Sequence, residues 1–325
     1  MAQPNLEQFK KRGVVAKIEA IVGTDAGPTA LANGVMLLNG TSGTEVDKVE
    51  RPIDRPFFGG TPFAVSNERG FIEGEFELYP PATPGALATS SADCEVLLLP
   101  AGMTSVKDEV AKTTRYNPIS DGIKSSTAYF FHAGTQKKIL GARHNLTGLS
   151  ITIGDRFKGN VRVQGDCKDV SEAALPTITL PDTVPTPARA ENTETNVVVN
   201  GGAKLLVWAK SLSVDIGNQQ ATKEYTSHKE TGITDRSPTF SLRIAKTALA
   251  DFDPWTVRRS AATFEASLRL KEADGRYSEL GIRGQIETIN EVDIDGDYGW
   301  EISGPCVPSS AGGDELYIEF GDANP

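Results

Sequence analysis

Three glutamates at alternating positions are the feature of this sequence whose type and spacing come closest to catalytic chemistry. Glu73, Glu75 and Glu77 occur in the segment FIEGEFEL. Alternate side chains of a strand point to one side about 7 Å apart, which is compatible with the paired carboxyl groups of a glycoside hydrolase. No cluster of His, Tyr or Trp accompanies them to bind a sugar. We therefore interpret the row as the charged side of a strand that borders water or a channel, because like charges repel one another in a packed core.

A second acidic stretch, Asp293-Ile-Asp295-Gly-Asp297, resembles the start of a calcium-binding loop. An EF-hand loop requires Gly at its sixth position and Glu at its twelfth. This chain has Tyr298 and Gly304 there. The stretch is therefore predicted to be an acidic hairpin turn.

The chain has few nucleophiles and metal ligands. It contains three cysteines, none in a CxxC pair, and three histidines. Cys94, Cys167 and Cys306 are predicted to be buried as small apolar residues, and His144, beside Arg143, to lie on the surface. The GxSxG, P-loop and strand-linked GxGxxG motifs are absent. We predict no catalytic residues, no metal site, no cofactor and no enzymatic activity.

Apolar and polar residues alternate along much of the chain, which predicts half-buried antiparallel strands. The clearest segments are 71–78, 160–164, 211–216, 239–244, 263–270 and 300–303. Helical signals are few: one spans Ser91–Leu99, and another spans Lys246–Phe252, where Asp253-Pro254 would end it. The sequence predicts an all-β fold with one or two short helices.

Composition and charge narrow the function classes. The 325 residues are 38% hydrophobic, which suffices for a buried core, and carry a formal net charge of -10. Such a charge repels phosphate and disfavours proteins that wrap nucleic acid. No apolar run reaches the ~18 residues of a membrane span, and the N-terminus lacks the apolar centre of a signal peptide. We expect a protein that is made and kept in the cytoplasm of its host.

The chain changes in composition near its middle and then repeats an order of features. Four prolines and many threonines between Glu172 and Gly202 predict an extended linker. LGAR at 140–143 corresponds to LGIR at 280–283, and each is followed by a strand, a Gly/Asp turn, a strand and a Gly-x-Cys ending. Chance would also produce some likeness between alternating segments, but the shared order favours a duplication.

This duplication predicts two antiparallel β-sandwich or barrel units in tandem. The first unit is the longer one and is expected to carry extra loops near Pro80–Thr89 and Thr104–Thr127. The predicted organisation is an N-terminal arm at 1–12, a first unit at 13–171, a linker at 172–202 and a second unit at 203–325.

Several segments, in order, resemble the major tail tube proteins of long-tailed, non-contractile bacteriophages. The likeness covers most of residues 13–170 and recurs over residues 203–321. The segments are Gly13–Gly23 (GVVAKIEAIVG), Thr24–Thr29, Val49–Arg51 leading to Phe57–Gly60, Glu68-Arg69, Cys94–Gly102 (CEVLLLPAG) and Ile139–Asn145 (ILGARHN).

The resemblance implies a tail tube fold, in which two antiparallel sheets pack together beside a helix and the sheets of neighbouring subunits join around a lumen. Single-unit members form hexameric rings, so two units in one chain imply trimeric rings with pseudo-sixfold symmetry, stacked head to tail. It also implies a place in the virion tail, assembly in the host cytoplasm, and a tape-measure protein, a tail terminator and distal tail proteins as partners. DNA would pass through the lumen without specific binding.

Two sets of residues are candidates for these roles. Glu73, Glu75 and Glu77 are expected to face the lumen, where carboxylates would repel DNA. The segment Val46–Val65 is expected to reach the next ring, as the resemblance implies. Its candidate contact residues are Pro52, Pro56, Phe57, Phe58, Gly59 and Gly60.

Two alternatives remain open at this point. One is another virion part of related fold, such as a tail terminator, a distal tail protein or a contractile-tail inner tube protein. The other is a secreted carbohydrate-binding or hydrolytic β-sandwich, which would present exposed Trp and Tyr side chains. Trp208, Trp255 and Trp300 are instead expected in or beside apolar strand faces.

Overall fold

The structure is a computed structural model that describes residues 11–54, 59–81, 93–180, 185–205, 207–226 and 228–322. Strands dominate these residues, and the helical segments are short, so the predicted all-β class is confirmed. The elements are β1 (Arg12–Ile18), β2 (Gly34–Val35), β3 (Leu38–Glu50), β4 (Phe63–Glu77), α1 (Glu95–Leu98), η1 (Leu99–Ala101), β5 (Met103–Asp108), β6 (Thr113–Pro118), β7 (Ser126–His132), β8 (Thr135–Thr152), β9 (Lys158–Glu172), β10 (Thr193–Val199), β11 (Ala209–Asp215), β12 (Asn218–Tyr225), β13 (His228–Arg236), β14 (Thr239–Ala245), α2 (Pro254–Arg259), β15 (Phe264–Lys271), β16 (Arg276–Gly284), β17 (Thr288–Ile294), β18 (Asp297–Pro305) and β19 (Leu316–Asp322).

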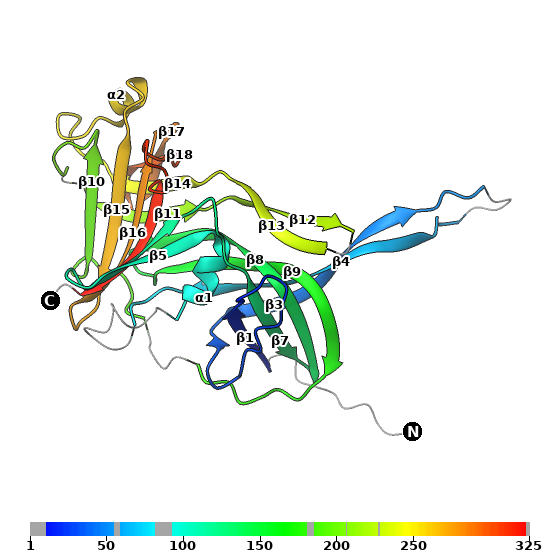
Figure 1. Ribbon diagram of the computed structural model, residues 1–325. Coiled ribbons are helices and arrows are strands. Elements are labelled where there is room, and N and C mark those ends of the chain that lie inside the picture. Colours follow the sequence, from blue (N-terminus) through cyan, green and yellow to red (C-terminus); the bar gives the residue numbers. More distant parts are fainter. Residues whose placement is uncertain are drawn as a thin grey trace.

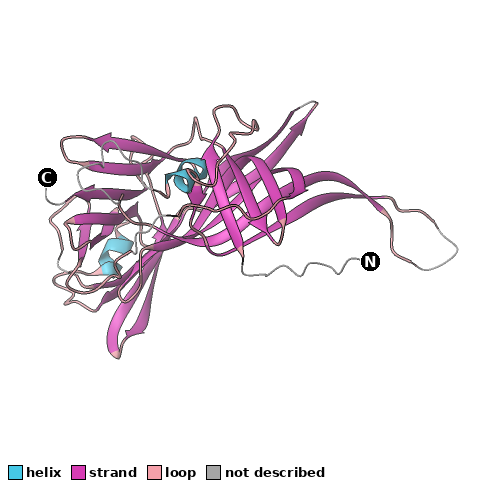
Figure 2. Ribbon diagram, turned by 90° about the horizontal axis from the view of Figure 1, so that it is seen from below, coloured by secondary structure: helices cyan, strands magenta, loops and turns pink. Residues whose placement is uncertain are grey.

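The described strands form one large sheet, a second sheet and a two-stranded ribbon. The large sheet contains the path β3-β4-β9-β8-β11-β14-β18-β17, and β7, followed by β1 and β2, pairs with the first part of β8 along the edge that meets β11 at its end. The second sheet has the order β10-β15-β16-β19-β6-β5. Figure 1 shows β3 and β4 extending from the body as a long ribbon, with β12 and β13 running toward its base. Figure 2 shows the sheets from below.

The pairings of the first half recur in the second half. In the first half, β1 pairs with β7, β7 with β8, β8 with β9, β9 with β4 and β4 with β3. In the second half, β10 pairs with β15 and β15 with β16, while β17 pairs with β18, β18 with β14 and β14 with β11. The long bent strand β8 therefore corresponds to two strands of the second half: β16, through its pairing with β7, and β17, through its pairing with β9.

The main hydrophobic core of the described residues runs through both halves. The predicted alternating segments overlap β4, β9, β11, β14, β15 and β18, and their apolar residues are buried as expected. Ile72, Leu146, Leu212 and Trp300 all belong to the same buried cluster, although they come from four different strands. Burying a side chain of this size contributes about 1.5–3 kcal/mol, so a core that spans both halves couples their stability.

One of the two predicted helices is misplaced. The predicted segment at 91–99 overlaps α1 and η1, but the segment at 246–252 is not helical. Helix α2 instead begins after Asp253, whose carboxylate accepts hydrogen bonds from the backbone N–H groups of Trp255 and Thr256. Asp253 is thus an N-cap and Pro254 the first helical residue, a position where proline is favoured. The pair that was predicted to end a helix therefore begins one.

Two segments expected to be irregular contain strands. β10 lies within the predicted linker at 172–202 and forms an edge of the second sheet. The predicted extra loop at 104–127 contains most of the β5–β6 hairpin, which joins that sheet through β19 although it belongs to the first half of the chain. Tyr116 of β6 is buried there against Phe320, with 6.0 Å between ring centroids. Residues 82–92, which include most of the other expected loop, lie outside the described residues.

The bend in β8 is held by a buried carboxylate that the sequence analysis did not single out. Gly141 has φ +60, a conformation that favours glycine, and its N–H donates to Glu19 at 2.8 Å. Ser125 and Thr127 donate their hydroxyls to the same carboxylate, at 2.6 and 2.8 Å. Together with the N–H of Gly23, these donors satisfy the buried Glu19 charge and fix the end of β1 against β7 and β8.

His144 is buried, so its predicted surface position is wrong. The side chain points from β8 into the core beneath α1, where Nδ1 donates to the Leu97 carbonyl at 3.0 Å. Nε2 lies 2.8 Å from the Ser126 hydroxyl, which donates to it. Both ring nitrogens of the neutral imidazole are thus satisfied, and burial lowers the pKa of His144 from 6.5 to about 4.

This burial predicts a pH dependence of stability. The unfolded chain takes up the His144 proton at higher pH than the folded chain, so stability should fall as pH drops from about 6.5 toward 4. Replacing His144→Gln removes the titrating group. We expect the free energy of unfolding of the natural protein to lose up to about 1.4 kcal/mol per pH unit relative to the variant in that interval, measured by urea denaturation. A difference that does not change with pH would contradict the buried neutral imidazole.

Candidate functional surface

The large sheet has one polar side that continues without interruption across eight described strands. Cross-strand partners share a side of a sheet, so the pairing registers identify the residues on it. We call this side the polar face. Its polar members include Thr41, Glu73, Glu75, Asn145, Thr147, Ser150, Thr152, Lys158, Asn160, Arg162, Ser211, Ser213, Ser241, Arg243, Asn290, Glu301 and Ser303, and Phe71 and Val292 are apolar residues on the same side.

The polar face carries hydroxyl, amide and charged side chains, while the opposite side carries the core. Ile72, Val163, Leu212 and Ile302 alternate with polar-face residues and are buried. The two sides extend from β3 in the first half to β17 in the second, so they do not stop at the boundary between the halves. A sheet that is apolar on one side only is expected to cover a core with that side and to present the other to solvent.

The three candidate glutamates lie along β4, and each is paired with a cation. The carboxylate of Glu73 accepts from Arg162, which also binds Glu45 at 2.6 Å. Glu75 lies 3.6 Å from the ammonium of Lys158. The glutamates share one side of the strand as predicted, but their basic partners do not follow from the local sequence, because they come from β9 about 85 residues later.

Glu77 differs from the other two glutamates. Only 8% of its surface is exposed, and its carboxylate accepts a hydrogen bond from Arg156 in the turn before β9. The lumen-facing assignment of the row remains a prediction. For Glu77, however, the carboxylate is already buried and paired with Arg156 within the chain itself.

The second half repeats the central ion pair with its charges exchanged. Arg162 and Glu301 each lie three residues before the glycine of the Gly-x-Cys ending, in β9 and β18. Arg162 pairs with Glu73 of β4, whereas Glu301 pairs with Arg243 of β14 at 2.9 Å. The two halves thus have the same pair at the same place with opposite polarity. Local charge balance is therefore the common feature of these positions.

The ribbon of β3 and β4 exposes apolar side chains. Val49, Ile53, Phe63 and Val65 are each at least half exposed. Of the predicted contact residues in this segment, Pro52, Gly59 and Gly60 are exposed, and Pro56, Phe57 and Phe58 lie outside the described residues. Exposed apolar side chains gathered on one projection are typical of a protein-binding surface.

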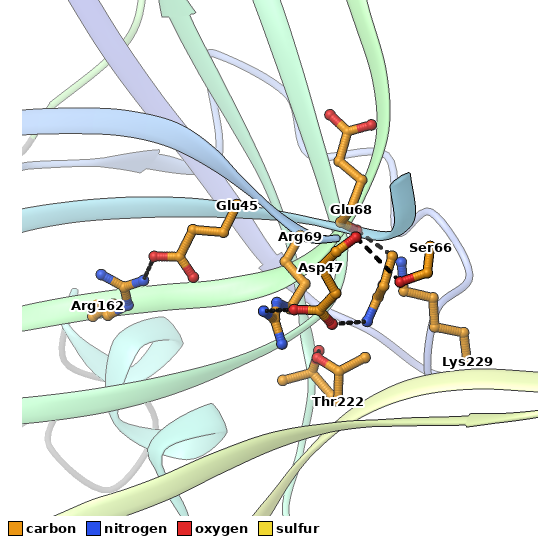
Figure 3. A network of polar contacts seen from close by, with 10 residues as sticks. Glu45, Asp47, Ser66, Glu68, Arg69, Arg162, Thr222 and Lys229 are labelled. Atoms are coloured by element: carbon orange, nitrogen blue, oxygen red, sulfur yellow. Dashed lines mark hydrogen bonds and ion pairs between the residues drawn. The ribbon is translucent and has the colours of Figure 1, made fainter. Parts of the chain in front are cut away.

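A network of polar contacts anchors the base of this ribbon (Figure 3). Asp47 of β3 binds Arg69 of β4 at 2.7 Å and accepts from the Asn67 amide at 3.3 Å. Its backbone carbonyl accepts from the Ser66 hydroxyl at 3.1 Å. The register of β3 and β4 shifts immediately after Asp47, so the network fixes the direction in which the ribbon leaves the body.

The second ribbon, β12–β13, lies against the first half of the chain. Lys229 donates to the Glu68 carbonyl at 2.7 Å and to Asp166 at 2.8 Å, as Figure 3 shows for the first contact. Glu230 pairs with the buried Arg143 at 3.2 Å. This ribbon cannot be predicted from alternation, because its residues are polar on both sides and lack the apolar period of a half-buried strand.

The remaining candidate residues have structural roles. Asp293–Asp297 forms the turn between β17 and β18, where the Asp293 carboxylate accepts from the Gly296 N–H at 2.7 Å, as predicted for a hairpin turn. Within the described part of the chain no group of three or more His, Cys, Asp or Glu side chains is arranged to hold a metal ion. Cys94 and Cys306 are buried as expected, while Cys167 is partly exposed.

The tryptophans only partly match the prediction. Trp300 is buried in the core, and Trp255 packs edge-on against it with 5.2 Å between ring centroids. Trp208 is 72% exposed, so its predicted place on an apolar strand face is wrong. It precedes β11 at the end of the sheet, where a single aromatic ring does not make a sugar-binding platform.

Comparison with known proteins gives the family. A sequence model of the phage tail tube protein family matches residues 10–301. The chain belongs to the phage tail tube protein family. It is accordingly a structural protein of the virion tail that assembles with other tail proteins, as the resemblance in the sequence implied. No curated protein matches the chain. None of the described helices is long and apolar enough to cross a membrane.

The exchanged ion pair can be tested by charge reversal in the second half, where no third charged side chain among the described residues binds Arg243 or Glu301. Arg243→Glu places two carboxylates side by side and should lower the free energy of unfolding by about 0.5–1 kcal/mol. The double variant Arg243→Glu/Glu301→Arg restores the polarity found in the first half. We expect it to recover most of that loss in urea denaturation, and a double variant no more stable than the single one would refute the equivalence.

Proposed function

We propose that this tail tube protein polymerises into stacked rings that form the tube of a long-tailed, non-contractile phage and conduct its genome. The observation that carries this proposal is the polar face, which runs unbroken through eight described strands on the side of the sheet opposite the core. Such a sheet can be continued by further copies into a closed wall with a wet inner side. The role is structural and requires no catalysis.

Two tandem units per chain form the second part of the proposal. The units are those expected from the sequence, the first at 13–171 and the second at 203–325, and β10 from the expected linker joins the second unit. The recurrence of the same strand pairings in both halves supports a duplication. Three chains then supply six units, which gives a trimeric ring with pseudo-sixfold symmetry. Stacking of such rings is heterologous and open-ended, so a separate protein, the tape measure, must set the length.

The polar face lines the lumen in this proposal, with Glu73 and Glu75 directed inward. Free arginine or lysine side chains on this face would bind phosphate and retain DNA. The ion pairs of Arg162, Lys158 and Arg243 occupy these cations with carboxylates of the same sheet. The wall therefore does not retain DNA, because its cations are already bound by carboxylates. The net negative charge of the chain adds a repulsion between the wall and the DNA phosphates.

The β3–β4 ribbon makes the contact with the next ring. Its exposed Val49, Phe63 and Val65 would be covered there, and the network at Asp47 holds the ribbon in its projecting direction. The tail terminator and distal tail proteins would bind the two ends of the stack, where ring surfaces remain free. Assembly takes place in the host cytoplasm.

Negative-stain electron microscopy of the purified protein tests the function. We expect rings and hollow tubes formed by this chain alone or after nucleation by tail tips. A protein that stays monomeric under every assembly condition, although folded by circular dichroism, would overturn the tube proposal.

The ribbon assignment predicts the effect of shortening it. The Arg51 N–H donates to the Pro62 carbonyl at 3.0 Å, so residues 52–61 can be replaced by Asn-Gly, which closes a two-residue hairpin turn. We expect this variant to fold but to form no tubes. Val110→Ser, at a side chain 90% exposed on the β5–β6 turn, is a control for loss of exposed surface. Tubes of normal length from the shortened chain would refute the assignment.

The lumen assignment predicts a defect in genome delivery. Glu73→Lys with Glu75→Lys leaves the buried Glu77 untouched and places unpaired cations on the polar face. Phage carrying this change should assemble tails but eject DNA several-fold more slowly, most strongly at low salt, because phosphates bind the freed cations. Glu73→Gln with Glu75→Gln is the isosteric control. Unchanged ejection rates for the lysine variant would place these residues outside the lumen.

A further inference from the structure

The two halves of the chain are joined by a short antiparallel junction between β8 and β11. Thr152, Ile151, Ser150 and Leu149 pair with Ser211, Leu212, Ser213 and Val214. The junction continues to the Ile216 N–H, which donates to the Leu146 carbonyl at 3.2 Å. It is the contact that makes one sheet of the two four-stranded arrays, β3-β4-β9-β8 and β11-β14-β18-β17.

Each partner in this junction has a counterpart in the other half. Because Glu73 and Arg243 occupy the same place, the registers of β3 with β4 and β11 with β14 align Thr41–Thr44 with Ser211–Val214. In the same way, the registers of β8 with β9 and β17 with β18 align Leu146 with Glu291 and Ser150 with Ile294. β3 thus corresponds to β11, and β17 to the end of β8.

These two counterparts are the free edges of the large sheet along this path. β3 pairs only with β4, and β17 only with β18, among the described strands. One outer edge of each is therefore left with unpaired backbone groups, a condition that proteins relieve by pairing or by shielding the edge. The edges lie at opposite ends of the eight-strand path, so a single chain does not pair them with each other.

We propose that β17 of one chain pairs antiparallel with β3 of the next, so that the contact between chains repeats the junction between the halves. The partner is a second copy of this chain, and the inference rests on the proposed ring. The contact is heterologous, since each copy offers β17 on one side and β3 on the other. Such contacts close into a ring when the rotation that relates one chain to the next completes a full turn after a whole number of chains.

The internal junction also fixes the register. Val214 opposite Leu149 corresponds to Thr44 opposite Asp293, and the bond from Ile216 to Leu146 corresponds to Val46 opposite Glu291. β8 has a bulge between these positions, where Gly148 has φ +59. The register of β17 with β18 has no shift, so both contacts fall in one regular ladder. Each step forward along β3 then opposes one step back along β17, so the two residue numbers of every opposed pair sum to the same value.

A disulfide between copies tests this register. Directly opposed Cα atoms in an antiparallel pair are about 4.5–5.5 Å apart, within the range of about 4.4–6.8 Å that a cystine spans. The variant Thr44→Cys/Asp293→Cys is assembled under reducing conditions, imaged, oxidised and run on a non-reducing gel. Thr44→Cys/Asn290→Cys is the matched control, because Asn290 lies three residues away on the other side of β17. Val46→Cys/Glu291→Cys is the second in-register pair, used if the first does not assemble.

We expect covalent dimers and trimers from an in-register pair, at least tenfold more than from the control, and none from the single cysteine variants. Tubes that form without cross-links, or with equal cross-links in the control, would overturn this register and leave the tube proposal standing. Failure of the natural protein to assemble would instead overturn the proposed function.

Discussion

The pairing of Leu149–Thr152 with Ser211–Val214 is the interaction on which the rest of the structure depends. It is only four residue pairs long, but it aligns two four-stranded arrays so that apolar side chains share one side and polar side chains the other. Because the side-chain period of a strand is two, a slip by one residue here would turn the apolar side of one half toward water. The common core and the continuous polar face therefore both follow from this register.

The polar face shows what such a surface requires beyond hydrophilicity. Arg162 and Arg243 are each bound by a carboxylate from the neighbouring strand, yet the acid is on β4 in the first half and the base is on β14 in the second. Pairs of this kind, partly exposed to water, add little to stability. Their consistent effect is to leave few unpaired charges on the face. Local neutrality there contrasts with the formal net charge of -10 of the whole chain.

Alternation in the sequence predicted the strands and the side on which Glu73 and Glu75 lie, because a period of two is a local property. It did not predict their partners, since Arg162 and Lys158 are brought to them by pairing of distant strands. His144 next to Arg143 was expected at the surface, but α1 covers it and supplies a carbonyl to its ring. Asp253-Pro254 is compatible with either a helix end or a helix start, and only the packing of Trp255 on Trp300 decides between them.

The two halves are joined more firmly than strand pairing alone would achieve. The β5–β6 hairpin of the first half completes the second sheet through β19, and Arg236 of the second half donates to the Gly102 carbonyl beyond α1 and binds Glu315 at 2.9 Å. In turn, the β12–β13 ribbon of the second half lies against the first half, where Lys229 binds Asp166 and Glu230 binds Arg143. In a ring of three chains, junctions inside a chain would therefore be rigid, and those between chains would depend on the free edges of β3 and β17. The curvature of the ring would follow from contacts within each chain, and the closure of the ring would depend on the contacts between chains.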